Sequence, residues 1–404
     1  MTRSREDTDY CMRLVSDLSE VEPSAWNALL PESPGAVFMR HEWLAALEST
    51  GCVGEGSGWQ PLHMLLETAQ GRLVGAAPLY AKSHSYGEYV FDWAWADAYR
   101  RHGLAYYPKL LSAVPFTPVA GPRLLAADDR IRTLLARLLA EQAERANLSS
   151  LHVLFPDDDG RRALEAAGFM IRLGVQFHWR NDDYPDFEAF LASLSQPKRK
   201  KIRAERRKVA EAGVRCERRV GTEITPEDWR FFIGCYDTTY AEHHSTPYLN
   251  LAFFEAVSRA MPQAFVLNIA RVDGEPVACS LLVRDGDRLF GRYWGARRFI
   301  PHLHFELAYY QSIEAAIALG ATVIEGGAQG EHKMARGFLP VQTCSAHRLT
   351  EPAFADAVDR YLERERGMID GYLDELNERA PFRRAGGGAI AAQTGTASQP
   401  RTPT

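Results

Sequence analysis

Cysteine is sparse in this chain and is not arranged for cross-linking or metal binding. The 404 residues include only six cysteines, and no two of them form a C-x-x-C pair. A small secreted scaffold or a structural zinc domain would need closely spaced cysteines. The pattern instead suits a reducing compartment, and we predict a cytoplasmic protein.

Long apolar runs are missing as well. No segment approaches the roughly 18 consecutive apolar residues that a membrane-spanning helix needs. The first ten residues, MTRSREDTDY, are charged and lack the apolar centre of a signal peptide. Any contact with a membrane is therefore expected to be peripheral.

The overall composition, 46% hydrophobic and 25% charged, is that of an ordinary globular protein. The length suits about two domains of usual size. Charge is unevenly spread, because residues 198–208 hold eight Lys and Arg side chains and one Glu, a local charge of +7. Since the net charge is −5, the rest of the chain carries −12. This polarity indicates one anion-attracting helix rather than a general nucleic-acid-binding protein.

The predicted elements follow the same order in the two halves of the chain. Hydrophobic periodicity and turn signals predict two helices, three strands, a helix, a strand, a helix and a strand in each half. In the first half these are helices 23–30 and 40–50, strands 62–68, 73–81 and 88–95, helix 129–146, strand 151–155, helix 161–167 and strand 170–179. In the second half they are helices 225–242 and 249–260, strands 263–271, 276–284 and 288–294, helix 303–319, strand 322–325, helix 331–336 and strand 343–349. A repeat this long indicates two copies of one domain rather than a solenoid.

Two features of the first half carry specific expectations. The strand predicted at 88–95 would place Phe91, Trp93 and Trp95 on one face. The four prolines of the next stretch, at positions 108, 115, 118 and 122, are expected to exclude regular structure between 106 and 122.

The predicted domain division follows from this order. We expect an N-terminal domain at 10–180, a basic helical connector at 181–221 and a C-terminal domain at 222–350. A charged amphipathic helix at 351–384 and a low-complexity tail at 385–404, expected to be disordered, complete the chain.

Four segments resemble the FemAB-like family of bacterial peptidoglycan biosynthesis and recognition proteins, within the GNAT acyltransferase superfamily. They are FDWAWADAYRRHGLAYYPKLLSAVPFTPVAGPRLL (91–125), PKRKKIRAERRKV (197–209), PHLHFELAYYQ (301–311) and EGGAQGEHKMARGFLP (325–340). The element order is that of the GNAT fold, and a tandem pair joined by a basic helix resembles the Fem-type aminoacyltransferases. The resemblance implies an α/β (α+β) protein with tandem GNAT-like domains, each a mixed, mostly antiparallel sheet flanked by helices.

The same resemblance implies transfer of an activated acyl or aminoacyl group onto an amine, with a peptidoglycan precursor as acceptor. A typical GNAT enzyme holds the pyrophosphate of acyl-CoA with an R/Q-x-x-G-x-G/A loop. The matching slot here, WGARRFIPHLHFE (294–306), lacks the second glycine at that spacing. Acyl-CoA and aminoacyl-tRNA are the two candidate donors, and this departure argues against coenzyme A.

The stretch TVIEGGAQGEHKMARGF (322–338) is the leading candidate for the active site. Its glycines allow the backbone to approach a ligand closely. Glu331 and His332 are predicted to be the catalytic base and proton shuttle, and the expected substrate contacts are Gln329, Lys333 and Arg336. The alternative to a catalytic role is that Glu331 only caps a helix and that its neighbours are solvated, since acids are favoured at helix N-termini.

Glu306 is the other candidate base. Glu306, Tyr310, Ile313 and Ile317 are spaced to share one face of an α-helix, which would leave the carboxylate partly desolvated. The alternative is a buried Glu paired with Arg292 or Arg336 for structure. The nearby H-x-H-x-E sequence is not a zinc-protease signature, so no metal is expected.

Further substrate contacts are predicted in both halves. In the second half they are His304, Tyr310, Arg292 and Trp294, and in the first half Asp92, Trp95, Tyr107 and Lys109 are expected to line a cleft between the domains. The counterpart of 322–338 in the first half, residues 155–169, has neither Gly-Gly nor His. A single active site would therefore belong mainly to the second domain.

Several alternatives remain open at this point. The basic helix could contact a tRNA acceptor end or anionic lipid, or it could be a solvated connector with Ile202 and Val209 as its apolar stripe. The protein could be a non-catalytic recognition protein for a peptidoglycan precursor or peptide. It could also be an acetyl-CoA-dependent N-acetyltransferase for small molecules.

Overall fold

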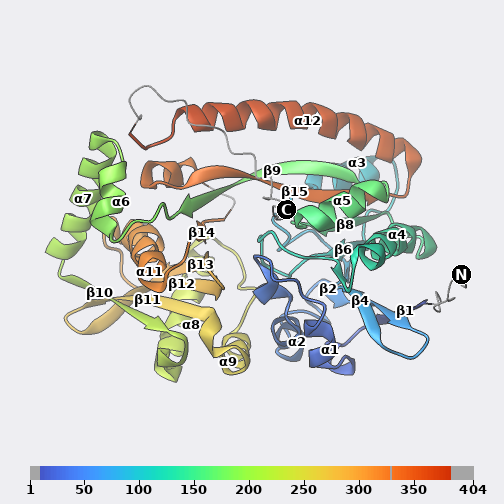
Figure 1. Cartoon of the computed structure of the whole chain (residues 1–404), viewed down its shortest axis with the longest axis horizontal. Helices are drawn as coiled ribbons and strands as arrows, with labels where there is room; N and C mark the ends of the chain where they lie inside the picture. Colours follow the sequence, from blue (N-terminus) through green and yellow to red (C-terminus); the bar gives the residue numbers. More distant parts are fainter. Residues whose placement is uncertain (1–9, 328–329, 384–404) are drawn as a thin grey trace, which may run out of the picture.

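The computed structural model describes residues 10–327 and 330–383, which form two β-sheets covered by helices (Figure 1). The first half contributes β1 (Tyr10–Val15), α1 (Pro23–Asn27), α2 (His41–Ser49), β2 (Trp59–Pro61), β3 (His63–Thr68), β4 (Leu73–Ala77), β5 (Tyr80–Lys82), α3 (Trp93–Arg101), β6 (Lys109–Ser112), β7 (Leu125–Ala126), α4 (Asp129–Arg145), β8 (Ser150–Leu154), α5 (Asp158–Ala166) and β9 (Met170–Arg180).

The second half begins with α6 (Phe187–Ser193) and the basic helix α7 (Gln196–Glu211). It continues with β10 (Val214–Val220), α8 (Pro226–Glu242), α9 (Leu251–Ala260), β11 (Phe265–Val272), β12 (Glu275–Asp285), β13 (Arg288–Ala296), α10 (Leu303–Phe305), the π-helix η5 (Glu306–Tyr310), α11 (Gln311–Leu319), β14 (Val323–Glu325), the 3-10 helix η6 (Glu331–Arg336), β15 (Leu339–Leu349) and α12 (Pro352–Glu378).

Local sequence signals start several helices at the expected residues. Helix α8 begins with a capping box, in which the Thr225 hydroxyl accepts from the Asp228 N–H and the Asp228 carboxylate accepts from the Thr225 N–H. Pro226 occupies the first helical position, where its missing N–H costs nothing. Helix α4 is capped by Asp128, whose side chain accepts from the Ile131 N–H.

The two halves exchange their last strands within one large sheet. That sheet has the strand order β10-β11-β12-β13-β14-β9-β15-β8-β6-β5-β2, and a smaller one has the order β1-β3-β4-β7. Strand β9, from the first half, lies between β14 and β15, while β15, from the second half, lies between β8 and β9. The two parallel pairs, β6 with β8 and β13 with β14, occupy matching places. The halves therefore cannot separate without breaking the ladders of β9 and β15.

The face of the sheet that carries α2 and α9 joins the halves through a shared apolar core. Trp43 of α2 contacts Phe253 of α9 with ring centroids 5.3 Å apart, and Phe38 contacts Phe290 of β13 at 5.1 Å. Separate apolar clusters lie under α4 and α11, and α12 runs along the top of β9 and β15 (Figure 1). The joint between the halves is thus built like a domain interior rather than like a loose interface.

The predicted strand at 88–95 is wrong, because the chain turns there and then forms helix α3. Its aromatic side chains do not share one buried face. Phe91 and Trp93 are exposed, whereas Trp95 and Tyr99 are buried one helical turn apart. Alternation of aromatics in the sequence therefore reflected an exposed loop followed by a helix with a 3.6-residue repeat.

Regular structure also occurs within the proline-rich stretch, contrary to the expectation. Strand β6 lies between Pro108 and Pro115 and pairs with β5 and β8. A proline blocks only the hydrogen bond of its own nitrogen, so four residues between two prolines can still join a sheet. Strand β1, which precedes the first predicted helix, was not expected either.

The predicted fold class is confirmed: the protein is a mixed α/β structure with large sheets flanked by helices. The exact domain division remains a prediction, and residues 385–404 lie outside the described part of the chain. Among the described helices, none is both long and apolar enough to cross a bilayer.

Gly326, at the end of β14, tests the contact between the halves. A methyl group on Gly326 would lie 2.8 Å from the Phe177 carbonyl oxygen of β9 and 3.0 Å from the Phe338 ring. We expect Gly326→Ala to lower the free energy of unfolding by about 1–3 kcal/mol, the usual cost of overpacking. Urea unfolding followed by circular dichroism measures the change.

The matched control is Gly371→Ala in α12, where a methyl group would meet no atom within 4 Å. We expect this variant to raise the free energy of unfolding by about 0.5–1 kcal/mol, because alanine is the better helix former. Equal unfolding midpoints for Gly326→Ala and the natural protein would contradict the close approach of β14 and β9.

Candidate functional site

Strands β13 and β14 diverge after only three paired positions. The last pair joins Phe290 to Glu325, after which β13 continues beside β12 alone. A bulge at Arg292, where Leu281 faces Tyr293 and Leu282 faces Gly291, accompanies the divergence. A bulge bends a strand and increases its twist. The edge of β13 that faces β14 is thus left without a strand partner among the described residues, although the Trp294 carbonyl accepts a hydrogen bond from the Thr239 hydroxyl at 3.1 Å.

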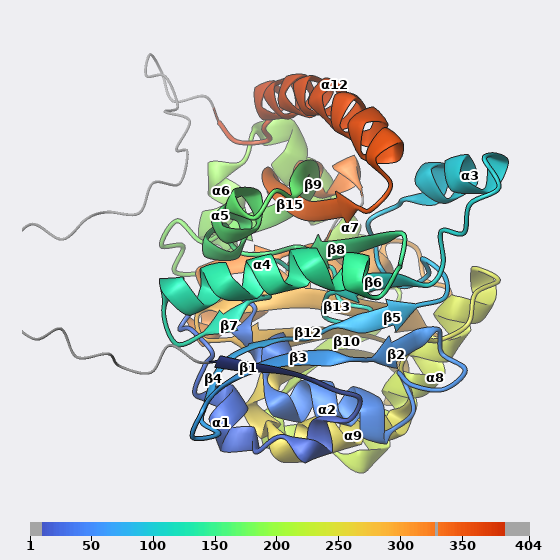
Figure 2. The same cartoon turned by 90° about the vertical axis from the view of Figure 1, so that its right-hand side faces the viewer.

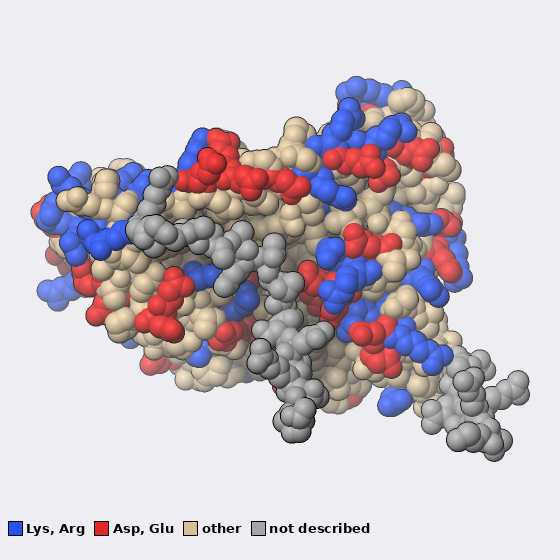
Figure 3. Space-filling view, turned by 45° about the horizontal axis from the view of Figure 1, so that its top comes forward, with Lys and Arg blue, Asp and Glu red and all other residues tan. Residues whose placement is uncertain are grey.

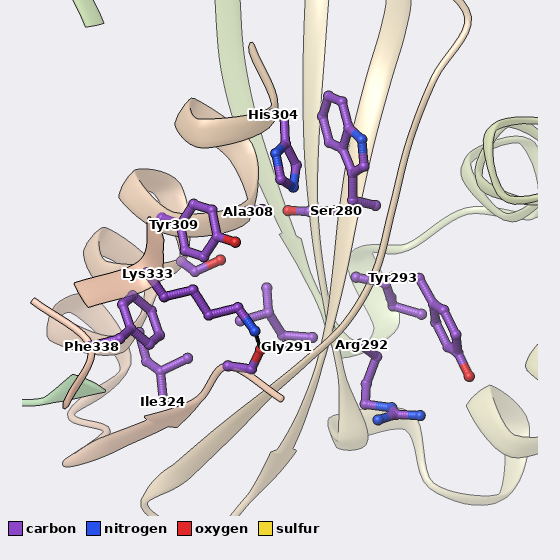
Figure 4. A pocket seen from close by; sticks show the side chains of 15 residues that line it. Ser280, Gly291, Arg292, Tyr293, His304, Ala308, Tyr309, Ile324, Lys333 and Phe338 are labelled. Carbon is purple, nitrogen blue, oxygen red and sulfur yellow. Dashed lines mark hydrogen bonds between the residues drawn. The ribbon is translucent and has the colours of Figure 1, made fainter. Parts of the chain in front are cut away.

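A cavity of about 160 Å³ lies in this opening (Figure 4). The residues that line it belong to β12, β13, the helical segment made of α10, η5 and α11, strand β14 and residues 326–338. Figure 4 shows Tyr309, Lys333 and Phe338 on one side and Arg292 and Tyr293 on the other, with His304 near Ser280 above. In the first half, Leu135 and Ala136 of α4 belong to one apolar cluster with Leu110 and Val153 of the sheet.

A π-helix shapes one wall of the cavity. In the segment Glu306–Tyr310 the Leu307 carbonyl accepts hydrogen bonds from the hydroxyls of Ser280 (2.9 Å) and Ser312 (3.3 Å). A π-turn adds one residue to the helical repeat and is frequent at functional sites. Tyr309 therefore faces the cavity, whereas α-helical spacing had favoured Tyr310. No signal in the sequence spacing marks this shift.

Tyr309 and His332 form a hydrogen-bonded pair, with the phenol oxygen 2.9 Å from Nε2. Burial raises the pKa of Tyr309 to about 12. Burial also lowers the pKa of His332 from its ordinary value, and the nearby charges of Arg336 and Lys333 lower it further. Near pH 7 the phenol is protonated and the imidazole is neutral, and either ring can donate this hydrogen bond, so the pair can pass a proton in either direction.

Lys333 reaches into the cavity from η6. Its ammonium donates to the carbonyl oxygens of Gly326 and Gly327, the first of which Figure 4 shows as a dashed line. Burial lowers the pKa of Lys333 to about 8. At pH 7 the cation remains charged in a largely dry place without a carboxylate partner among the described contacts, so it can attract an anionic group.

Arg336 and Tyr310 lie behind the cavity and attach η6 to the basic helix. The Arg336 guanidinium donates to Glu205 of α7 (3.0 Å) and to the Tyr310 hydroxyl (3.1 Å), and it stacks 3.5 Å from the centroid of the Phe305 ring. It also donates to the His332 carbonyl at 2.9 Å. These two residues position the loop of His332 and Lys333, and neither lines the cavity.

Glu306 is buried and paired, but outside the cavity wall. Its carboxylate accepts from Arg206 of α7 at 3.0 and 3.2 Å and from the Gln311 amide at 3.0 Å. This geometry matches the structural alternative, with Arg206 as the partner in place of Arg292 or Arg336. A role for Glu306 as the base stays a prediction.

Three other predicted residues of the second half do meet at the cavity: His304, Arg292 and Trp294. Burial lowers the pKa of His304 to about 4, so its ring is neutral at pH 7. Arg292 donates to the Phe116 carbonyl of the first half at 2.7 Å. The first half thus supplies part of the frame of the site without lining it.

The predicted residues of the first half belong to a separate buried network. Lys109 donates to the Ser85 hydroxyl (2.9 Å), to Glu88 (2.8 Å) and to Asp92. The Tyr107 hydroxyl forms a hydrogen bond with the Ser85 hydroxyl. The Trp95 ring packs against the rings of His152 and His347. None of these four residues lines the cavity, and they do not form the expected wall of a shared cleft there.

Two predicted residues lie beyond what the structure describes, namely Gln329 and the side chain of Glu331.

One further acid, Glu325, was not predicted as a site residue. It ends β14 at the point of divergence, is almost fully buried and pairs with Arg288 at 3.2 Å. Burial raises the pKa of Glu325 to about 7, but its carboxylate, like that of Glu306, is not part of the cavity wall. An acid that closes an apolar strand just before two glycines was the signal available in the sequence.

Comparison of the sequence with known proteins shows the family of this chain, and comparison of the structure shows proteins with a similar fold. The sequence model of the FemAB-like family, described as peptidoglycan biosynthesis/recognition, matches residues 17–384. No curated protein matches the chain by sequence.

Three solved structures are similar in fold at low identity. FemX is 13% identical, with a TM-score of 0.50 over 84% of this chain and 98% of that one. L-PGS from Bacillus licheniformis is 11% identical, with a TM-score of 0.52 over 84% and 97%. A C-terminal DUF2156 domain from Agrobacterium fabrum, assigned as a lysylphosphatidylglycerol synthetase, is 10% identical, with a TM-score of 0.52 over 86% and 97%.

The environment of Lys333 predicts an unusual titration. After reductive ¹³C-methylation, we expect its NMR signal, assigned with Lys333→Arg, to titrate near pH 8, because burial disfavours the ammonium. Between about pH 8 and the ordinary lysine value of about 10.4 the unfolded chain binds a proton that the native chain does not, so Lys333 makes stability rise with pH there. A Lys333 signal that titrates at the ordinary lysine value of about 10.4 would contradict the buried position.

Proposed function

This chain belongs to the FemAB-like family of peptidoglycan biosynthesis and recognition proteins, and from that membership we propose that it is an acyl- or aminoacyltransferase. The proposed reaction moves an activated acyl group directly onto an amine of a cell-wall precursor. The observation that carries the proposal is the cavity at the divergence of β13 and β14, with Tyr309 in its wall and the exposed His332 hydrogen-bonded to Tyr309. A cytoplasmic location is part of the same proposal.

The geometry supports a direct transfer. The amine nitrogen attacks the acyl carbon, and the unpaired edge of β13 together with Lys333 stabilises the oxygen on which negative charge develops. His332 takes the proton that the amine loses, and Tyr309 gives its proton to the leaving group. A carbon–nitrogen bond forms, the bond to the leaving group breaks, and His332 returns the proton to Tyr309. No covalent intermediate on the protein is required.

The basic helix supports a donor with an anionic carrier. Ile202 and Val209 are buried, as the connector alternative expects, while Lys200, Lys201, Arg207 and Lys208 remain exposed. In Figure 3, Lys and Arg side chains gather at the left-hand end of the molecule, the end at which Figure 1 shows α7. Because Glu205 of α7 holds Arg336, and Arg336 holds the His332 loop, a donor bound along α7 would lie next to the site. This placement favours aminoacyl-tRNA over acyl-CoA as the donor.

Native mass spectrometry of the purified protein tests the proposal against its alternatives. The protein is offered acetyl-CoA, aminoacyl-tRNA and a muropeptide precursor in turn, and retained mass is recorded. Retention of both aminoacyl-tRNA and the precursor supports the proposed transferase. Retention of the precursor alone supports a recognition protein, and retention of acetyl-CoA supports a small-molecule N-acetyltransferase.

Substitution of the proposed proton-transfer pair should lower turnover and leave binding intact. With the donor and acceptor that mass spectrometry identifies, we expect Tyr309→Phe and His332→Ala each to reduce kcat by about 10²–10⁴-fold, the usual contribution of a positioned acid or base. Product formation is followed by mass. Glu306→Gln is the comparison variant, since its carboxylate contacts Arg206 and Gln311 outside the cavity. Full turnover in Tyr309→Phe, or a greater loss in Glu306→Gln, would overturn the assignment.

A further inference from the structure

Exposed aromatic side chains gather on one short stretch of the first half. Four of the eight large hydrophobic side chains exposed in the described residues fall within it: Tyr86 (59% exposed), Tyr89 (37%), Phe91 (59%) and Trp93 (42%). We call these four the aromatic platform. The rings of Tyr86 and Trp93 are 5.2 Å apart, so the platform is continuous at that point. Exposed aromatic surface of this density marks an interaction site.

The platform is held in place by the buried network beneath it. Lys109, which is fully buried, donates to Ser85, Glu88 and Asp92, and these three residues alternate with the platform residues along the chain. Arg172 adds a hydrogen bond to the Phe91 carbonyl at 2.7 Å. Removing one partner from a buried ion pair is strongly destabilising, so this arrangement fixes the loop firmly. The aromatic rings are therefore presented outward by a rigid support.

The platform leads into a positively charged helix. Helix α3 lies at the edge of the molecule in Figure 2, with Trp95 and Tyr99 packed against His347 and Phe354. At its end the side chains of Arg100 and Arg101 are 81% and 74% exposed, and Leu104 beyond them is 42% exposed. Both arginines pair with Asp97 on the surface, and such exposed pairs are weak enough to yield to another anion. These cations stand on a chain whose net charge is −5.

We propose that the aromatic platform docks onto the surface of a lipid bilayer. Tyr, Trp and Phe side chains beside Arg suit the interface between head groups and acyl chains, where aromatic rings partition and cations meet anionic lipids. Tyr89 and Phe91 also line a cavity of about 250 Å³. Tyr86 and Trp93 are not part of that cavity wall.

Gly87, between Tyr86 and Tyr89, packs against the Phe116 ring, and the Phe116 carbonyl accepts a hydrogen bond from Arg292 of the cavity between β13 and β14 at 2.7 Å, so docking brings the wall of this cavity toward the head groups. Docking would also bring an acceptor at the membrane close to the cavity, and this consequence rests on the proposed function. The docking of the aromatic platform itself does not rest on it.

Co-sedimentation with vesicles tests the docking without requiring turnover. The full chain is mixed with vesicles of phosphatidylcholine and with vesicles of equal parts phosphatidylcholine and phosphatidylglycerol. We expect binding to both, tighter to the anionic vesicles. Phe91→Ala with Trp93→Ala should weaken binding to both by about tenfold or more, because two partly inserted rings are removed. Arg100→Gln with Arg101→Gln should weaken binding by about fivefold or more on the anionic vesicles alone.

The control variant is Phe299→Ala, which removes a 90% exposed ring on the second half and should leave binding unchanged. Thermal unfolding of each variant checks the fold, which substitution of exposed side chains should preserve. If the full chain binds neither kind of vesicle, the proposal is wrong. Binding that survives Phe91→Ala with Trp93→Ala but is lost in Lys200→Glu with Lys201→Glu would overturn it too, since α7 would then be the membrane contact. A failure here leaves the transfer assay unaffected, so the two proposals can fail separately.

Discussion

The exchange of β9 and β15 between the halves is the constraint on which the rest of the structure depends. Each half ends in a strand that completes the sheet of the other half, so neither half has a finished sheet alone. The site inherits this dependence. Gly326, which follows β14 at the cavity, donates its N–H to the Phe177 carbonyl of β9 at 2.9 Å, and Arg292 on the opposite side donates to Phe116. A site that lies in the second half is therefore framed on two sides by the first.

A parallel pair of strands diverges after three paired positions in each half, but the helices that follow differ. In the first half, α4 contributes apolar residues to a buried cluster and packs closely on Gly75 of β4 through Ile131 and Leu135. In the second half the equivalent helix contains the π-turn, whose displaced Leu307 carbonyl is satisfied by Ser280 and Ser312. Two serines in place of apolar side chains thus stabilise an irregular helix that leaves a cavity instead of filling it.

Sequence reasoning succeeded where the signal is local and failed where it is not. The capping box of α8, the long amphipathic helices and the repeated element order follow from neighbouring residues, and the fold class followed from them. The exchange of β9 and β15 links residues far apart in the chain, and no periodicity encodes it. The π-turn moved Tyr309 into the place expected for Tyr310, because α-helical spacing assumes a constant repeat. Glu306 found its partner in Arg206, one hundred residues away, in a helix read as a connector.

Two of the three buried lysines in the described residues, Lys109 and Lys333, show how the same kind of side chain supports a loop in one half and lines a site in the other. An ammonium group has three donors. Lys109 directs them to Ser85, Glu88 and Asp92, so its donors are used and two carboxylates balance its charge. Lys333 has only the carbonyls of Gly326 and Gly327 among the described residues, which leaves a donor and an unbalanced charge beside the cavity. An anion that arrives there completes the coordination of Lys333, whereas nothing remains for a ligand to complete at Lys109. The same chemistry therefore makes a rigid support for the aromatic platform in the first half and a place for developing negative charge in the second.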